Sequence, residues 1–195
     1  MPVRVKLHCR GFLVQCPSPM KHYDFAEKLR ILWDKACAHY AKGQRDAGTY
    51  FTVKELAFLA ANGLTAQHLY DYAEDFTADG EPTWNTALAI ELVRRDYFLN
   101  AQAGKASRVG LDEATLPAKT AAVLGIEWLP RIIPKARAKL RGELPASLMY
   151  CCGGDRKFFK TNDIHPAEFL SLVWRHEHAD AAIVDWVVRR SKAAQ

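Results

Sequence analysis

Apolar side chains recur at three- and four-residue steps through most of this 195-residue chain, and that spacing constrains its fold more than any other feature. One clear stripe follows Tyr23: Phe25, Leu29, Leu32, Trp33, Ala36, Cys37 and Tyr40. Similar stripes predict helices near residues 52–62, 65–77, 83–102, 166–177 and 180–190. We therefore expect an all-α fold, a compact helical domain of about seven to eight helices.

Residues typical of helix ends support several of these helices. Thr52 and Glu55 have the spacing of a capping box, and Gly63 follows where a left-handed cap would end the helix. Thr65 is expected to be the N-cap of the next helix. A short helix is expected after the loop that contains Cys152.

The segment between Pro117 and Gly142 is expected to hold two helical pieces, divided near Gly125 and Pro130. In the second piece Pro134 is expected in the first turn, where a proline is tolerated.

The chain is expected to divide into an arm and two packed helical halves. Residues 1–22 form an extended N-terminal arm in this interpretation, because apolar and polar side chains alternate over its first residues. Residues 23–103 form the N-terminal helical half, and residues 117–190 form the C-terminal helical half. The polar stretch between them is expected to be a connection or a mobile loop within one compact unit.

The charge balance is mildly basic, with a formal net charge of +5. Nucleic-acid-binding proteins usually gather their basic residues on one stripe, whereas here most are scattered. We therefore expect no nucleic acid as partner and a small-molecule, anionic substrate instead. No apolar run approaches 18 residues, so we expect no membrane association. Homodimerisation through the N-terminal arm is a further possibility.

The odd number and irregular spacing of the cysteines argue against a secreted disulfide framework: Cys9, Cys16, Cys37, Cys151 and Cys152. No Cys-x-x-Cys pair is present, so a structural zinc site has no signature. We expect a cytoplasmic protein without a cofactor.

The C-terminal half resembles a family of small bacterial helical domains known as domain of unknown function 5069. The resemblance covers roughly residues 118 to 188 and depends on residues in matching order: Leu129-Pro130-Arg131, Lys135-Ala136-Arg137-Ala138, Leu140, Gly142, Tyr150, Cys152, Asp155, Lys157, Phe158, Ile164 and Asp185-Trp186-Val187. Lys157 replaces a usual arginine, and His165 replaces a common acidic residue. The resemblance implies an α-helical fold and implies no activity.

The loop around Cys152 is the first candidate site. The glycine pair 153–154 can bring backbone N–H groups close to an anion. Cys152 is a candidate nucleophile if nearby Arg156 or Lys157 favours its thiolate, and Asp155 is a candidate to orient a base. The alternative is structural: a buried cysteine, with Asp155 as a helix N-cap.

The helix after Thr65 carries the second candidate site. His68, Asp71, Tyr72 and Asp75 share one face of this helix. A histidine with carboxylates suits acid–base catalysis, or forms part of a metal site. A solvated acidic face with local His–Asp pairs is the structural alternative.

Cationic side chains supply candidate substrate-binding groups. Arg95 and Tyr97 near the end of one helix are candidates to hold a carboxylate, although pairing with Glu91 would also explain Arg95. Three cations on one helix, Arg131, Lys135 and Arg137, favour either anion binding or buried salt bridges to the acidic helix. Arg131 and Arg137 are our candidate anion anchors.

The sequence lacks a P-loop, a G-x-G-x-x-G fingerprint, a G-x-S-x-G elbow and an H-E-x-x-H motif. We therefore expect a small cofactor-independent enzyme, a lyase, isomerase or hydrolase, which acts on a small polar or anionic molecule where the two halves meet. His68 or Asp75 is the expected acid–base group. Two alternatives stay open: a non-catalytic helical binding or interaction module, and a metal-dependent enzyme that uses His68 with Asp71 or Asp75.

Overall fold

The fold is all-α apart from one short hairpin. The computed structural model describes residues 22–193, and the expected arm at residues 1–22 therefore lies outside them except for His22. The described part has eight α-helices: α1 (Phe25–Ala41), α2 (Val53–Ala61), α3 (Ala66–Asp79), α4 (Trp84–Asp96), α5 (Leu129–Arg141), α6 (Gly153–Thr161), α7 (Pro166–Arg175) and α8 (Asp180–Ala193). None of the described helices is long and apolar enough to cross a membrane.

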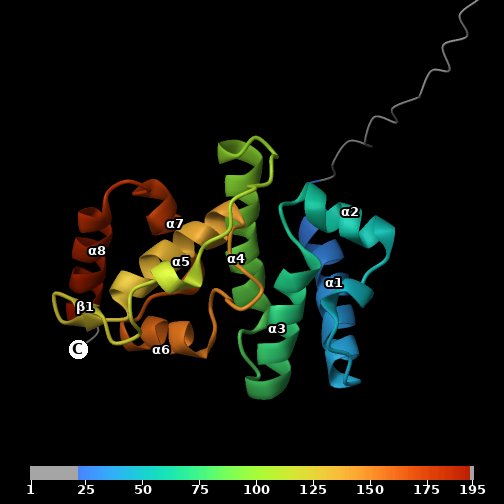
Figure 1. The fold of residues 1–195 in the computed structure, drawn as a ribbon, viewed down its shortest axis with the longest axis horizontal. Helices are drawn as coiled ribbons and strands as arrows, with labels where there is room; N and C mark the ends of the chain where they lie inside the picture. The colour runs from blue at the N-terminus through green and yellow to red at the C-terminus, as the bar shows by residue number, and fades with distance from the viewer. Residues whose placement is uncertain (1–21, 194–195) are drawn as a thin grey trace, which may run out of the picture.

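Helix α4 lies between two groups of helices (Figure 1). On one side of it are α1, α2 and α3, and on the other are α5, α6, α7 and α8. Each group has its own cluster of buried apolar side chains. Ala87 of α4 belongs to the first cluster, and Ile90, one turn later, belongs to the second. One helix therefore contributes to both cores.

The expected caps are present in the N-terminal half. The Thr52 side chain accepts from the Glu55 N–H, and the Glu55 carboxylate accepts from the Thr52 N–H, which confirms the capping box. Thr65 caps α3 in the same way. Gly63 follows α2 with φ +75°, the left-handed conformation expected of it. The helix expected over residues 83–102 is α4, extended by one π-helical turn at Tyr97–Ala101.

The segment before α5 contradicts our expectation. Instead of a first helical piece, residues 122–127 form an antiparallel hairpin of β1 (Ala122–Val123) and β2 (Ile126–Glu127). Leu124 and Gly125 have positive φ in its turn, which ends any helix there. Helix α5 begins at Leu129, so Pro134 lies inside the helix and not in its first turn. Burial of one face of α5 offsets the free energy lost with the backbone hydrogen bond that Pro134 cannot donate.

Candidate active site

A lysine, a cysteine and an aspartate meet where α5 passes the start of α6. Lys135 Nζ lies 3.2 Å from Cys152 Sγ and 2.7 Å from Asp155 Oδ2. Lys135 and Asp155 are buried, with 2% and 0% of their surfaces exposed, whereas Cys152 is partly exposed. Cys152 is therefore the member of the cluster that has some surface exposed to solvent, while its two charged neighbours stay out of water.

Asp155 is held in place by donors from three directions. It accepts hydrogen bonds from Lys135 Nζ, from Trp128 Nε1 at 2.9 Å, and from the Cys151 N–H at 2.9 Å. This position corrects the alternative that Asp155 caps α6. The N-cap is Cys152, and Asp155 is the third residue of the helix. A fully bonded carboxylate orients its lysine rigidly.

The start of α6 presents uncapped backbone donors in the two residues that follow Cys152. The first N–H groups of any helix lack an intrahelical acceptor, and no side chain caps α6. Gly153 and Gly154 supply the first two of these groups. The helix dipole adds partial positive charge at this end. The arrangement matches a nucleophile with an adjacent cation, an orienting carboxylate and donors for an oxyanion.

The electrostatics favour a charged Lys135 and protonated thiols at Cys151 and Cys37. Burial alone would lower the pKa of Lys135, but Asp155 and then Cys152 outweigh it and raise that pKa, so the ammonium persists. Burial, with the Asp155 charge as the second cause, raises the pKa of the Cys151 thiol to about 12. Burial, followed by the Asp34 charge, raises the pKa of Cys37 to about 11. Cys151 and Cys37 are therefore inert thiols near neutral pH.

Trp128 connects this cluster to a pocket. Its backbone is left-handed, with φ +69°, which is costly for an aromatic residue. Its ring lies against Gly154, because a Cβ at that position would be 2.7 Å from two ring carbons. The close approach explains why glycine occupies position 154.

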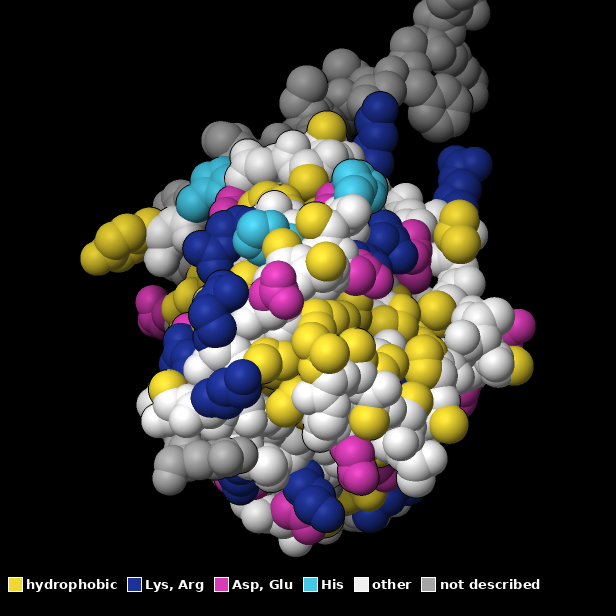
Figure 2. All heavy atoms as spheres, turned by 90° about the vertical axis from the view of Figure 1, so that its left-hand side faces the viewer, with side chains coloured by type: hydrophobic (Ala, Val, Ile, Leu, Met, Phe, Trp, Pro, Cys, Tyr) yellow, Lys and Arg dark blue, Asp and Glu magenta, His cyan; other side chains and the backbone are white. Residues whose placement is uncertain are grey.

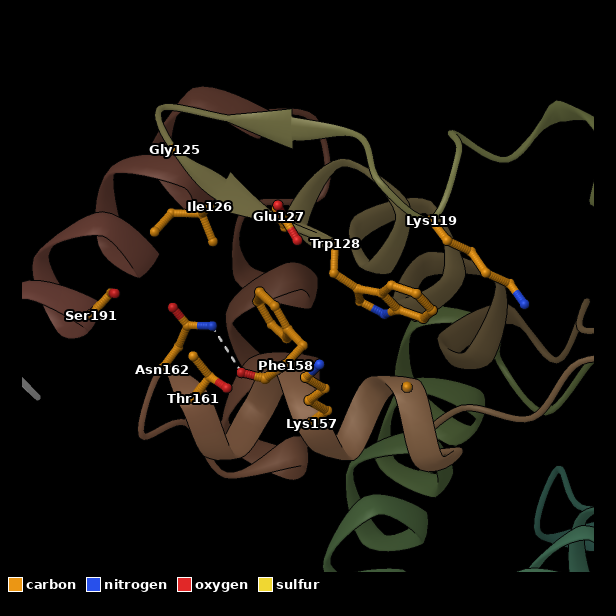
Figure 3. Close-up of a pocket in the computed structure, with 11 residues that line it drawn as sticks. Lys119, Gly125, Ile126, Glu127, Trp128, Lys157, Phe158, Thr161, Asn162 and Ser191 are labelled. Atoms are coloured by element: carbon orange, nitrogen blue, oxygen red, sulfur yellow. Dashed lines mark hydrogen bonds between the residues drawn. The ribbon is translucent and has the colours of Figure 1, made fainter.

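The pocket lies between the hairpin, α6 and α8 and has a volume of about 500 Å³. In Figure 3 the Trp128 and Phe158 rings and the Ile126 side chain lie around it, with Lys119 and Lys157 among its polar lining residues. Gly154 also lines it, and Cys152 lies two residues earlier in the chain. The elements that form the pocket belong to the end of the molecule that Figure 2 faces. Hydrophobic side chains gather in the middle of that face, and basic side chains lie along one edge.

Asp75, which the sequence predicts to be an acid–base group, is an ion-pair partner of Arg156. Arg156 Nη1 lies 2.5 Å from Asp75 Oδ2, and Nη2 lies 2.8 Å from Asp79 Oδ2. A third carboxylate, Glu81, lies 3.5 Å from Arg156 Nε. Asp75 thus joins α3 to α6 through an ion pair.

His68 and Tyr72 lie at the seam between the two helical groups. Tyr72 donates to Glu91 Oε1 at 2.7 Å, and Lys139 Nζ donates to the same oxygen at 2.6 Å. The His68 ring accepts from the Thr65 N–H through Nδ1. Burial, followed by the Lys139 charge, lowers the pKa of His68 to about 3. His68 is therefore neutral at physiological pH.

The expected anion anchors have protein partners. Arg131 donates to the Pro117 carbonyl, and Arg137 pairs with Asp180. Arg95 donates to Asn62 Oδ1 and contacts His22. Tyr97 donates to Glu177 Oε1 at 3.0 Å. No group of three or more His, Cys, Asp or Glu side chains suited to a metal ion occurs within residues 22–193.

Sequence reasoning missed the roles of four residues around these clusters. It named Lys135 only as an anion or salt-bridge residue and Glu91 only as a partner for Arg95, and it did not single out Trp128 or Lys139. A signal was present for Lys135 and Lys139, because they lie four apart in a helix whose apolar face includes Ile132, Ala136 and Leu140.

No curated protein and no solved structure matches the chain. A family model does match its C-terminal part, and the matched region contains the entire Cys152 cluster. Residues 115–195 match the domain of unknown function DUF5069, as the resemblance led us to expect.

Proposed function

We propose that the protein is a cysteine-dependent hydrolase of small activated acyl compounds, with Cys152 as nucleophile. The observation that carries the proposal is the contact of the buried Lys135 ammonium with both Cys152 Sγ and Asp155 Oδ2. A nucleophile, a charged neighbour and a group that orients that neighbour are the recurring parts of covalent catalysis. Of the reaction classes expected from the sequence, hydrolysis fits these parts best.

In the first step the Cys152 thiolate attacks the substrate carbonyl carbon. A C–S bond forms, and the carbonyl π electrons move to oxygen, where the Gly153 and Gly154 N–H groups stabilise the negative charge. The C=O bond then re-forms, and the leaving group departs with its bonding electrons. Water next attacks the acyl-cysteine, the thiolate leaves, and the two protons of the water pass to solvent. No oxidant or reductant is needed.

The charge state of Lys135 suggests the leaving group. Its raised pKa makes the ammonium a weak acid, so it stabilises the thiolate more readily than it donates a proton. A leaving group that departs as a stable anion needs no proton. Thioesters and aryl esters have such leaving groups, whereas amides and alkyl esters do not.

The pocket suggests the rest of the substrate. Its aromatic and aliphatic lining favours an apolar portion. Its two lysines, Lys119 and Lys157, outnumber its one carboxylate, Glu127, and favour an anionic group. We therefore propose a small anionic thioester or aryl ester, bound with its carbonyl at the N-terminus of α6.

The test uses 4-nitrophenyl acetate as an activated acyl probe. The wild-type protein should release one equivalent of 4-nitrophenolate in a rapid burst and carry the acyl group on the Cys152 peptide by mass spectrometry. Cys152→Ala should abolish the burst, while the matched variant Cys37→Ala should keep it. Lys135→Met should slow acylation about 10- to 100-fold, as expected for loss of a charge-assisted hydrogen bond. Absence of a burst, or equal acylation of Cys37, would refute the proposal.

A further inference from the structure

Trp128 occupies the corner between the hairpin and α5, and its backbone is held there from both sides. Its N–H donates to the Ala121 carbonyl at 3.0 Å. Its own carbonyl accepts from the N–H groups of Arg131 and Ile132, at 3.0 and 2.9 Å. With φ +69°, Trp128 has a left-handed conformation that bulky residues rarely adopt. Such strain persists only where the surrounding structure enforces it, and it clusters at functional sites.

The indole N–H of Trp128 reaches a carboxylate oxygen that has no other donor within residues 22–193. Asp155 Oδ1 accepts from Trp128 Nε1 at 2.9 Å. The second oxygen, Oδ2, accepts from Lys135 Nζ at 2.7 Å and from the Cys151 N–H at 2.9 Å. Asp155 is 0% exposed, so bulk water cannot replace the indole donor. Without Trp128 this buried carboxylate would have one unpaired oxygen, which is unfavourable.

The donors on Asp155 decide how the Lys135 ammonium is shared. Lys135 Nζ lies 2.7 Å from Asp155 Oδ2 and 3.2 Å from Cys152 Sγ, so the carboxylate and the sulfur compete for one cation. A donor on the far oxygen offsets part of the carboxylate charge. The carboxylate then draws less on the ammonium, which stays available to a thiolate. Loss of the indole donor would act in the opposite sense.

Other charged groups lie around the cluster and the pocket, and the indole N–H donates to none of them because it is already bonded to Asp155. Arg156 of α6 donates to the Cys151 carbonyl at 3.1 Å. Its carboxylate partners come from α3 and the turn after it: Asp75, Asp79 and Glu81. The charged residues that line the pocket are Lys119, Glu127 and Lys157. A substitution that removes only the indole N–H leaves all of these charges in place.

We infer that Trp128 is a positioning residue for the Cys152 thiol. Its indole N–H orients the Asp155 carboxylate, and that carboxylate holds the Lys135 ammonium against the sulfur. The same ring lines the pocket of about 500 Å³ (Figure 3), so a substrate bound there packs on the residue that orients the cluster. The inference rests on Cys152 as the nucleophile of the proposed hydrolysis and adds the donor that sets its reactivity.

The test compares Trp128→Phe with the wild-type full chain. Phenylalanine keeps an aromatic ring beside Gly154 but has no N–H to donate. The pH at which iodoacetamide alkylation of Cys152 reaches half its maximal rate should rise by about one pH unit in the variant. Near neutral pH, 4-nitrophenyl acetate should acylate the variant about 10-fold more slowly, with a half-saturating concentration changed less than about 2-fold. A role in stability alone would move neither value in the folded protein.

Trp186→Phe is the matched control. It makes the same change on α8, where the ring centroid lies 4.8 Å from Arg190 Cζ, and it should leave the alkylation midpoint and the acylation rate unchanged. If Trp128→Phe does not fold, NMR of the wild-type protein carries the test. The assigned indole ¹H–¹⁵N signal of Trp128 should then shift with pH at the midpoint of Cys152 alkylation, because its hydrogen bond responds to the charge of the cluster.

The outcomes separate this inference from the proposed hydrolysis. An unchanged alkylation midpoint in folded Trp128→Phe, or an equal shift in Trp186→Phe, would overturn the inference. An indole signal of Trp128 that does not move through the alkylation midpoint would overturn it as well. A shifted midpoint without any burst of 4-nitrophenolate from the wild-type protein would refute the hydrolysis and support the positioning role of Trp128.

Discussion

Single residues in this fold derive their properties from burial, and His68 is the clearest case. Its folded pKa is about 3, below the value near 6.5 of an unfolded chain. As the pH falls from 6.5 towards 3, the unfolded chain takes up a proton that the folded chain does not. The stability that neutral His68 contributes is therefore present above pH 6.5 and is lost on acidification.

This gives a prediction for His68→Asn, which keeps an acceptor for the Thr65 N–H. Between pH 6.5 and about pH 4 the wild-type protein should lose roughly 3 kcal/mol more stability than the variant. Urea denaturation at a series of pH values measures the difference. An imidazole that titrates near pH 6.5 by NMR in the folded protein would contradict the account.

A second prediction at this scale concerns the glycine pair at the start of α6. Gly154→Ala should destabilise the protein by about 1–3 kcal/mol, because the new methyl group overlaps the Trp128 ring, which Asp155 holds in place. Gly153→Ala is the matched control, since its Cβ would meet only Arg156 Nη2 at 3.7 Å. It should be neutral or slightly stabilising. Equal effects in thermal denaturation would show that the Trp128 contact is not tight.

Among the elements, α3 and α6 are joined by ion pairs of Arg156. Arg156 is buried and contacts Asp75, Asp79 and Glu81. Arg156→Met should destabilise the protein by about 1–3 kcal/mol, because it breaks several charge-assisted hydrogen bonds. Lys160→Met, which removes an exposed pair with Glu81, should cost less than about 1 kcal/mol. Chemical denaturation of both variants tests this, and a larger effect at Lys160 would be inconsistent with it.

The helices and the hairpin also show how much of the secondary structure could be predicted from the sequence. Helices α1 to α4 follow from apolar spacing and caps, because those signals are local. The hairpin before α5 was missed, since two residue pairs leave no periodic pattern and its turn depends on positive φ at Leu124 and Gly125. The N-cap of α6 was misassigned because Asp155 is drawn inward by Trp128 and Lys135, contacts between segments far apart in the chain.

The candidate sites show the same limit. His68, Tyr72, Cys152 and Asp155 could be named from residue type and spacing. Their partners could not, because Lys135 approaches Cys152, and Lys139 approaches Glu91, only through tertiary packing. A charged residue in a sequence is ordinarily assigned to the surface, and these lysines are buried.

At the scale of the whole molecule, α4 couples the two cores. Because Ala87 and Ile90 belong to different clusters on one helix, neither core can lose α4 without exposing part of the other. We therefore expect a single cooperative unfolding transition. Methyl NMR signals of Leu29 in one core and Val173 in the other should disappear at the same denaturant concentration. Separate midpoints would show that the halves unfold independently.

We propose for the molecule as a whole that folding activates one thiol, that of Cys152, by placing the Lys135 ammonium against its sulfur. The most direct measurement is the rate at which iodoacetamide alkylates each cysteine of the native protein near neutral pH, determined by peptide mass spectrometry. Cys152 should react at least about 10-fold faster than Cys37 and Cys151, and Lys135→Met should remove most of that advantage. A Cys152 rate equal to that of Cys37, or a rate unaffected by Lys135→Met, would contradict the account.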